Sequence, residues 1–497
     1  MKKFLSIALI LMLILSTAVA ASAEEERMTI TWLGYSQSPQ PDQERELYLE
    51  ERFNVNLEYP SIDAFDEEQF NMWLSGGGEF DVLNLSLGAN QFNTCVEQGL
   101  ARSIPVEWLE QYMPTWMEKA ASLVGGDVQT LIDQCSVDGE LYAVPLIMAN
   151  FMEPGIFLIR QDWLDNLNLK MPTNVEEFHD VLYAFTYNDP DGNGEDDTYG
   201  MNGNGRYYFN YVFGAYGIMK NSYYLQDDGS VVYTNTTEAY KEVMKLLQSW
   251  YKEGIIDPET ITDDRTKQRE KWGQGLFGVL PDNASWCSSG VLQNMVIDQN
   301  PDAVISYMPA FEGCGSYVDY PSALGNQGAF MFGYNTTDEE CIKIMQIKEA
   351  IASDPELYDY LYFGTEGVHY EKVDGYYKKL ITDNAELAAE GVGYWWGMQP
   401  KSFEEYNKEV MTEYVESHAV AQANPFVYNG RNFYVSGENE SNTWYGADVA
   451  TVADTFYADA LMGNIDIDEA WDGYIADLNA AGLDKIIAEY EQMVAAQ

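Results

Sequence analysis

The chain has 497 residues, with 80 Asp and Glu against 27 Lys and Arg and a formal net charge of -53. A surface with this charge repels nucleic acid and anionic lipid head groups, so neither is an expected partner. The length exceeds what one hydrophobic core normally supports, and the apolar share of 46% is typical of a globular protein. The sequence therefore predicts a globular protein of two or more lobes.

The first 23 residues have the pattern of a secretory signal peptide. Lys2 and Lys3 precede an apolar stretch at residues 4–15, and a cleavage site of small residues, A-S-A, ends at Ala23. Later apolar stretches are too short to span a bilayer. We therefore expect residues 1–23 to be a removed signal peptide and the protein to be exported, whether secreted, periplasmic or associated with the cell surface.

Several enzyme and metal motifs are missing from the sequence. H-E-x-x-H, G-x-S-x-G, a P-loop and G-x-G-x-x-G do not occur, so zincin, serine-hydrolase and nucleotide-binding functions lack their parts. The five cysteines have no C-x-x-C spacing, which argues against a zinc or redox motif. Buried thiols are expected, and one or two disulfides remain open because spacing does not fix the pairing.

Strand and helix patterns alternate from the start of the mature chain. A strand candidate at residues 28–34 precedes a helix candidate at 43–52 and a second strand at 55–59, which predicts a parallel α/β sheet. Two further apolar runs, at residues 141–146 and 155–159, are separated by a Pro-Gly break. We interpret this break as the passage into a second lobe, and a crossing between lobes is where a ligand cleft forms.

The second half of the chain repeats such elements. Helix candidates at residues 176–187 and 237–251 are followed by a short apolar strand at 275–280, which leads into the segment D-N-A-S-W. Met308 and the proline after it are interpreted as a return crossing, and residues 328–334 as a strand in the first lobe.

This order of segments resembles the extracellular solute-binding proteins of family 1, the sugar-binding receptors of ABC importers. The resemblance rests on D-G-E-L-Y-A-V-P from Asp138, R-Q-D-W-L from Arg160 and the tail at residues 462–483, and it covers nearly the whole mature chain. Many relatives carry a lipid-modified cysteine just after the signal, and this chain has no such lipobox cysteine.

The resemblance implies an α/β fold of the periplasmic-binding-protein-like type II, with two lobes, a hinge and an interlobe cleft. We expect the first lobe to comprise residues 27–144 plus 308–333, and the second lobe to comprise residues 145–307 plus 334–497.

An acidic loop after the helix candidate at residues 176–187 has the spacing of a calcium site. Its side-chain oxygens fall on positions 1, 3, 5 and 9 of a calcium loop, Gly194 supplies the turn at position 6, and a carbonyl fills position 7. Position 12 is Gly200 in place of the usual Glu, and a plain polar turn is the alternative. Similar loops in the family bind calcium, so we expect a structural Ca²⁺. The expected ligands are Asp189, Asp191, Asn193, Glu195 and Asp197.

A sugar site needs aromatic faces for the C–H faces of the sugar and polar groups for its hydroxyls. Trp286 matches the position of a stacking tryptophan in the family, whereas packing in the core is the alternative for the other rings. The candidate stacking residues are Trp286, Trp32, Tyr35, Tyr208, Tyr394, Trp395 and Trp396. The candidates for hydroxyl contacts are Asp282, Asn326 and Gln327.

The expected function is that of a non-enzymatic solute-binding protein, a monomer that captures an oligosaccharide or related sugar and delivers it to an ABC permease. A ligand that touches both lobes favours the closed state. The alternatives are a secreted polysaccharide hydrolase, which needs only two carboxylates flanking the sugar, and a receptor for peptides or lipids.

Overall fold

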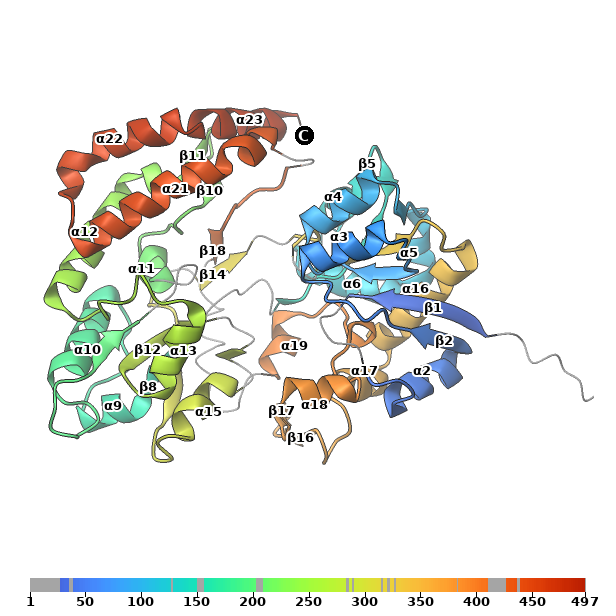
Figure 1. The fold of residues 1–497 in the computed structure, drawn as a ribbon, viewed down its shortest axis with the longest axis horizontal. Helices are drawn as coiled ribbons and strands as arrows, with labels where there is room; N and C mark the ends of the chain where they lie inside the picture. The colour runs from blue at the N-terminus through green and yellow to red at the C-terminus, as the bar shows by residue number, and fades with distance from the viewer. Residues whose placement is uncertain are drawn as a thin grey trace, which may run out of the picture.

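The computed structural model shows two α/β lobes side by side, the first on the right and the second on the left of Figure 1. The described residues are 27–34, 39–126, 128–149, 156–202, 209–282, 286–287, 290–313, 316–319, 322–325, 328–381, 383–409, 426–435 and 439–496. The predicted signal peptide at residues 1–23 lies outside them. No helix within these ranges is long and apolar enough to cross a membrane.

A six-stranded sheet forms the centre of the first lobe. Its strands are β1 (Met28–Leu33), β2 (Val55–Glu58), β3 (Val82–Asn84), β4 (Ala101–Arg102), β7 (Ala143–Pro145) and β15 (Ala329–Gly333). The order is β2-β1-β3-β15-β4, with β7 also paired to β15. β1 runs parallel to both of its neighbours, as the alternating pattern predicts, whereas β15 runs antiparallel to β3, β4 and β7.

The helices of the first lobe come from both ends of the sequence. The early ones are α2 (Glu44–Phe53), α3 (Glu67–Ser75), α4 (Ala89–Glu97), α5 (Glu107–Tyr112), α6 (Pro114–Ser122) and α7 (Gln129–Gln134), with the small hairpin β5 (Ser136–Val137) and β6 (Glu140–Leu141). The later elements are α16 (Asp338–Ser353), α17 (Pro355–Tyr362), the hairpin β16 (Tyr370–Val373) and β17 (Tyr376–Lys379), α18 (Asn384–Ala389) and the 3-10 turn η2 (Trp395–Gly397).

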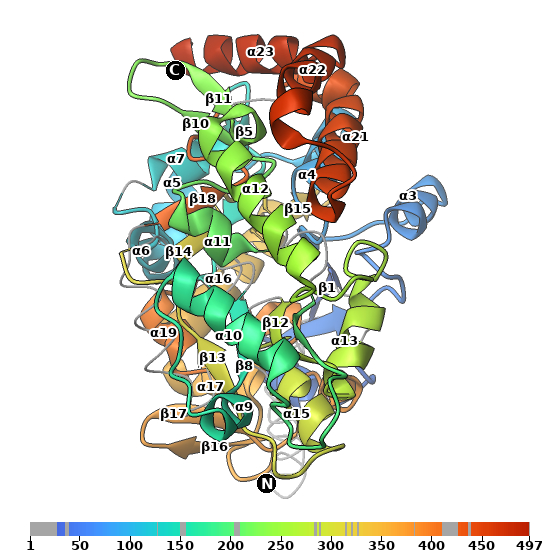
Figure 2. The same cartoon turned by 90° about the vertical axis from the view of Figure 1, so that its left-hand side faces the viewer.

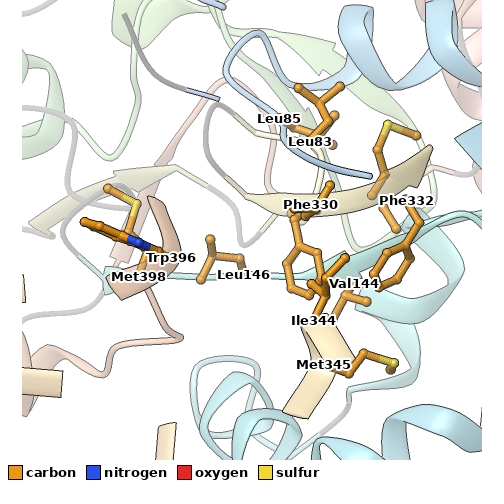
Figure 3. Packing of buried hydrophobic residues seen from close by; sticks show 14 of the residues in the cluster. Leu83, Leu85, Val144, Leu146, Phe330, Phe332, Ile344, Met345, Trp396 and Met398 are labelled. Carbon is orange, nitrogen blue, oxygen red and sulfur yellow. The ribbon is translucent and has the colours of Figure 1, made fainter. Parts of the chain in front are cut away.

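The core of the first lobe joins these two sets. Ile344 and Met345 of α16 and Trp396 of η2 lie in one buried cluster with Phe330 of β15 (Figure 3). The predicted boundary placed residues 334–497 in the second lobe, and this packing shows that it is wrong for α16, α17 and η2. Their apolar faces cover the first sheet, so the return into the first lobe continues to Met398.

A four-stranded sheet of order β13-β8-β12-β9 forms the centre of the second lobe. Its strands are β8 (Ile156–Arg160), β9 (Tyr199–Met201), β12 (Phe277–Asp282) and β13 (Ile305–Met308). β8 is antiparallel to β12 and β13, whereas β12 is parallel to β9. The helices that pack near this sheet are α9 (Gln161–Asn166), α10 (Val175–Tyr187), α13 (Arg265–Gly273) and α15 (Val291–Ile297).

A helical layer extends the second lobe and is seen from its outer side in Figure 2. It consists of α11 (Asn210–Ala215), α12 (Glu238–Glu253), α21 (Glu440–Met462), α22 (Ile467–Ala480) and α23 (Leu483–Ala495). It also includes the hairpin β10 (Tyr223–Leu225) and β11 (Val231–Tyr233), the turn η1 (Thr234–Thr236), and the parallel pair β14 (Ser316–Asp319) and β18 (Phe426–Asn429). A shared core holds these helices on the face of the sheet that carries Phe157 and Val279.

Three chain segments connect the lobes, after β7, after β13 and after Met398. The first and third run side by side, because the Ala149 N–H donates to the Lys401 carbonyl at 2.8 Å and the Lys401 N–H donates to the Ile147 carbonyl at 3.0 Å. The third segment forms α19 (Phe403–Asn407) between the lobes (Figure 1). The predicted two-lobed, hinged α/β fold is confirmed.

The short helix α19 contacts both lobes. Glu405 pairs with Lys119 of α6 at 2.7 Å, and the buried ring of Tyr406 belongs to an apolar cluster with Ile156 and Leu280 of the second lobe. The four described cysteines, Cys95, Cys135, Cys287 and Cys341, are buried free thiols, as expected. Cys314 lies outside the described residues.

Candidate functional site

The aromatic ring of Trp286 lies on the guanidinium group of Arg269 just beyond the carboxyl end of β12. The centre of the guanidinium is 3.8 Å from the ring centroid, and Trp286 remains 40% exposed. Large aromatic side chains of a folded protein are usually buried well below this level. A flat face that is open to solvent at the end of a sheet strand can stack on the C–H face of a sugar.

Arg269 is itself held by Asp282, the last residue of β12. The Nε and Nη2 atoms of Arg269 donate to the two carboxylate oxygens of Asp282 at 2.7 and 2.8 Å. Asp282 is only 1% exposed, and its carboxylate holds the guanidinium of Arg269. The sequence predicted a hydroxyl contact for Asp282, whereas the structure gives it the role of orienting Arg269.

The backbone beside Trp286 is fixed as well. Cys287 is fully buried, and its carbonyl accepts a hydrogen bond of 2.6 Å from the side-chain amide of Gln293, which is also fully buried. The antiparallel register places Asp282 opposite Ile156 at the first position of β8. The aromatic face is therefore supported from the strand end, from α13 and from the start of α15.

A lysine-centred acidic cluster surrounds Lys271, two residues after Arg269 on α13. Lys271 contacts Asp257, Glu259 and Asp263 at 2.9, 2.6 and 2.6 Å, and Asn202 donates to Asp257 and Asp263 at 2.7 Å each. Burial lowers the pKa of Lys271, but the three carboxylates outweigh burial and raise it above the ordinary value.

Within the described chain, this is the one place where three carboxylates bring oxygens within 4.8 Å of one another. The ammonium group of Lys271 already supplies the positive charge that a metal ion would bring there.

The acidic loop with calcium-site spacing connects α10 to β9. The Asn193 amide donates to Asp191 at 3.1 Å and to Asp197 at 3.2 Å, and the Glu195 N–H donates to the Asn193 side-chain oxygen at 2.7 Å. Asp189 accepts from the Gly194 N–H at 3.0 Å with one oxygen. Its other oxygen, Oδ1, is buried and has no hydrogen-bond partner.

The electrostatics of this loop favour a cation. Burial, followed by the negative charges of Asp197 and Asp189, raises the pKa of Asp191 above its ordinary value, although the Asn193 N–H opposes the shift. Gly194 has φ +85°, a conformation that favours glycine. An unpartnered buried oxygen among crowded carboxylates is the donor set that a hard cation such as Ca²⁺ prefers.

Three of the predicted sugar-stacking residues are buried in the first lobe. Trp32 is fully buried, and its indole N–H donates to the side-chain oxygen of Asn84 at 2.9 Å. Tyr394 and Trp396 are 3% and 0% exposed and pack edge to face with ring centroids 4.8 Å apart. The prediction that these three rings contact a ligand is therefore wrong.

A buried lysine contacts the backbone beside Trp396. Lys348 of α16 donates to the carbonyls of Trp396 and Met398 at 3.4 and 3.2 Å, and it lies 5.1 Å from the centroid of the Trp32 ring. Burial holds the pKa of Lys348 well below its ordinary value. The sequence gives no sign of this contact, because Lys348 lies in an ordinary helical pattern.

The remaining predicted ligand residues are not placed by the structure. Tyr35, Tyr208, Asn326 and Gln327 lie outside the described residues, as does the side chain of Trp395, whose backbone forms part of η2. Sequence reasoning missed Arg269, because an arginine in the helix before a strand has no distinguishing motif. Its importance appears only when the strand brings Asp282 and Trp286 to it.

Comparison with known proteins identifies relatives with similar sequences. Lipoprotein LipO of Bacillus subtilis is 27% identical over 279 residues, which cover 53% of this chain and 53% of LipO. The polygalacturonan/rhamnogalacturonan-binding protein YtcQ of B. subtilis is 26% identical over 352 residues, 69% of this chain and 66% of YtcQ. The fructooligosaccharide ABC transporter substrate-binding protein FusA of Streptococcus pneumoniae is 28% identical over 257 residues, 49% of this chain and 47% of FusA. The chain is thus similar in sequence to two proteins whose names describe glycan binding, YtcQ and FusA.

Two solved structures have folds similar to that of this chain. The alginate-binding protein AlgQ2, in a structure without calcium ion, matches with a TM-score of 0.63 and 20% identity over 94% of this chain and 98% of AlgQ2. An EF-hand mutant of FusA from S. pneumoniae with fructo-nystose matches with a TM-score of 0.65 and 21% identity over 94% of this chain and 99% of FusA. These structures show that the chain has the fold of these two proteins.

Two further findings describe which parts of the chain and of its relatives are matched. A domain of unknown function, DUF3502, matches residues 446–496, which include most of α21 and all of α22 and α23. The chain spans about half to two thirds of the length of the curated relatives it matches. Of these relatives, YtcQ and FusA are named as binding proteins.

Proposed function

We propose that the protein is the extracytoplasmic solute-binding component of an ABC importer, which captures an oligosaccharide or related sugar between its lobes and delivers it to the permease. The observation that carries the proposal is the half-exposed ring of Trp286, braced by Arg269 at the end of a second-lobe strand. Its homologues YtcQ and FusA are named for the glycans that they bind. Capture involves no bond making or breaking.

Rotation of the lobes about the hinge explains how the sugar would be captured. A sugar that stacks on Trp286 and also contacts the first lobe has a higher affinity for the closed arrangement, so it shifts the population toward that state. The paired first and third connections, joined at Lys401, allow the lobes to rotate while their own cores stay intact. The closed, loaded form is the one that a permease would distinguish from the empty form.

A glycan panel tests this function. Mature protein is screened by thermal shift against neutral and acidic oligosaccharides, and any ligand found is titrated by calorimetry. We expect an increase in melting temperature, one-to-one binding and no release of new reducing ends. The matched control is W286A, which should lose most of the affinity. A wild-type protein that binds no glycan, or that cleaves the ligand, would contradict the proposal.

We also propose that the loop between α10 and β9 holds a structural Ca²⁺. Asp189, Asp191, Asn193 and Asp197 would contribute side-chain oxygens, and Glu195 would contribute its carbonyl. The unpartnered Oδ1 of Asp189 supports this assignment. When bound, the ion supplies positive charge that neutralises the carboxylates and fixes the loop against α9, where Asn166 donates to the Pro190 carbonyl at 3.1 Å.

A further inference from the structure

The ring of Trp286 is in contact with the guanidinium of Arg269. The separation of 3.8 Å places the cation in direct contact with one face of the indole. At this distance both electrostatic attraction and planar stacking operate. One face of the ring is therefore covered, and the 40% exposure of Trp286 comes from the rest of it.

Arg269 is a rigid support and not a mobile surface side chain. Its side chain is 12% exposed, and it binds the carboxylate of Asp282 through two parallel hydrogen bonds. This two-point geometry fixes the plane of the guanidinium, which a single ammonium group cannot do. Because the guanidinium and the indole are stacked, fixing one plane fixes the other.

The backbone of α13 is fixed independently at Lys271, two residues after Arg269. Lys271 joins the helix to Asp257, which is buried, and to Asp263, whose side chain is 6% exposed. At the start of the same helix, the Asp264 side chain accepts from the Lys267 N–H at 2.7 Å. Arg269 thus projects from a helix that is anchored on either side of it.

We propose that Arg269 is the positioning residue of the sugar site: its contacts with Asp282 and Trp286 hold the indole in one orientation and leave a single face for the ligand. This inference rests on the proposed function. A tryptophan without such support loses rotamer freedom only when the ligand binds, which lowers affinity. Arg269 removes that cost beforehand, while Asp282 neutralises its charge, so the support does not depend on an acidic ligand.

Removal of the arginine alone would take two hydrogen bonds and a positive charge away from the buried carboxylate of Asp282. The test variant is therefore R269M combined with D282N, which removes both charges at similar volume. R269K is the second variant, since it keeps the charge and loses the two-point geometry. K267M is the matched control, because Lys267 lies on the same helix, is exposed and pairs only with Glu270 at 3.4 Å.

The first readout requires no ligand. The full chain is labelled with 5-fluorotryptophan, and the ¹⁹F resonance of Trp286 is assigned by its loss in W286F. We expect that resonance to sharpen and to move toward the position of a free indole in the double variant, to shift partly in R269K, and to stay unchanged in K267M. An unchanged Trp286 resonance in the double variant would overturn the proposal.

The second readout is affinity for kestose and for trigalacturonate, the two probes suggested by the relatives. For either probe that wild type binds, we expect the double variant to weaken binding by about tenfold, with R269K intermediate and K267M like wild type. Wild-type affinity in the double variant would refute the role of Arg269 and leave the proposed function standing. If wild type binds neither probe, the result counts against the proposed function. The ¹⁹F experiment then still tests whether Arg269 orients the Trp286 ring.

Discussion

The second lobe contains two acidic clusters that solve the same electrostatic problem in different ways. The carboxylates of Asp257, Glu259 and Asp263 surround Lys271, which lies within 2.9 Å of each. The loop that begins at Asp189 has similar side chains and no lysine or arginine contact among the described residues. One of its buried oxygens lacks any hydrogen-bond partner.

This difference shows that the number of carboxylates does not identify a metal site. A cluster whose positive charge is supplied by the chain itself is complete, whereas a cluster with an unpartnered buried oxygen requires a cation from outside or a proton. The two clusters are therefore expected to respond oppositely to calcium and to loss of a lysine.

The largest expected effect comes from K271M. The substitution leaves three carboxylates around an apolar side chain, and loss of one partner from a buried ion pair costs about 3 kcal/mol or more in the free energy of unfolding. Urea unfolding followed by circular dichroism measures the change, with K267M as the exposed control. In K271M, millimolar Ca²⁺ should restore part of the stability. A variant as stable as wild type would show that Lys271 is not the internal cation.

Removal of calcium from wild type should give the next largest effect. At a free concentration of about 100 times Kd, an ion that binds only the folded state contributes about 2.7 kcal/mol, so EDTA should lower the melting temperature by roughly 5 °C. In D189N the effect of EDTA should disappear, whereas a variant of the lysine-centred cluster, E259Q, should keep it. An EDTA-insensitive wild type would refute the calcium site.

A buried carboxylate can also be neutralised by a proton, and Glu46 in the first lobe is an example. Glu46 is 6% exposed, and its Oε2 has no hydrogen-bond partner. Burial, followed by the charges of Glu50 and Asp42, raises the pKa of Glu46 from 4.5 to about 7.

Because the folded state binds this proton more tightly, Glu46 stabilises the fold fully below pH 4.5 and loses that contribution as the pH rises to about 7. E46Q should remove this part of the pH dependence of the unfolding free energy. Parallel urea titrations of wild type and E46Q between these pH values measure it, and identical slopes would contradict the assignment.

The smallest expected effect concerns the ion pair between Lys119 and Glu405. This pair is partly exposed and joins the first lobe to α19. Such pairs contribute at most about 1 kcal/mol, so K119M should change stability little. Since α19 also inserts Tyr406 into the second-lobe cluster, loss of the pair should raise the radius of gyration of the ligand-free protein in X-ray scattering. An unchanged radius would show that the pair does not restrain the lobes.

The sequence could predict the two-lobed fold, because the fold follows from the order of segments. It could not predict that Tyr394 and Trp396 are buried. The backbone packs closely beside these rings, because a Cβ on Gly391 would lie 2.8 Å from the Trp396 ring and one on Gly397 would lie 3.3 Å from Leu361. Glycine serves close packing there.

The prediction that the second lobe resumes at residue 334 was wrong for a related reason. The apolar face of α16 shows that the helix is covered, but not which of two sheets covers it. Arg269 was missed because its partners, Asp282 and Trp286, come from a different element. By contrast, the spacing of the acidic loop was sufficient to bring Asp191, Asn193 and Asp197 together.

The interleaved path of the chain also constrains how the protein acquires its structure. Strand β15 occupies the middle of the first sheet, between β3 and β4, and is made from residues 329–333. An emerging polypeptide that has reached residue 145 therefore carries a sheet with a gap at its centre. The first lobe cannot finish folding until most of the second has been synthesised. Until then, the amino-terminal part of the chain stays incompletely folded, so chaperones can bind it and an export channel can accept it.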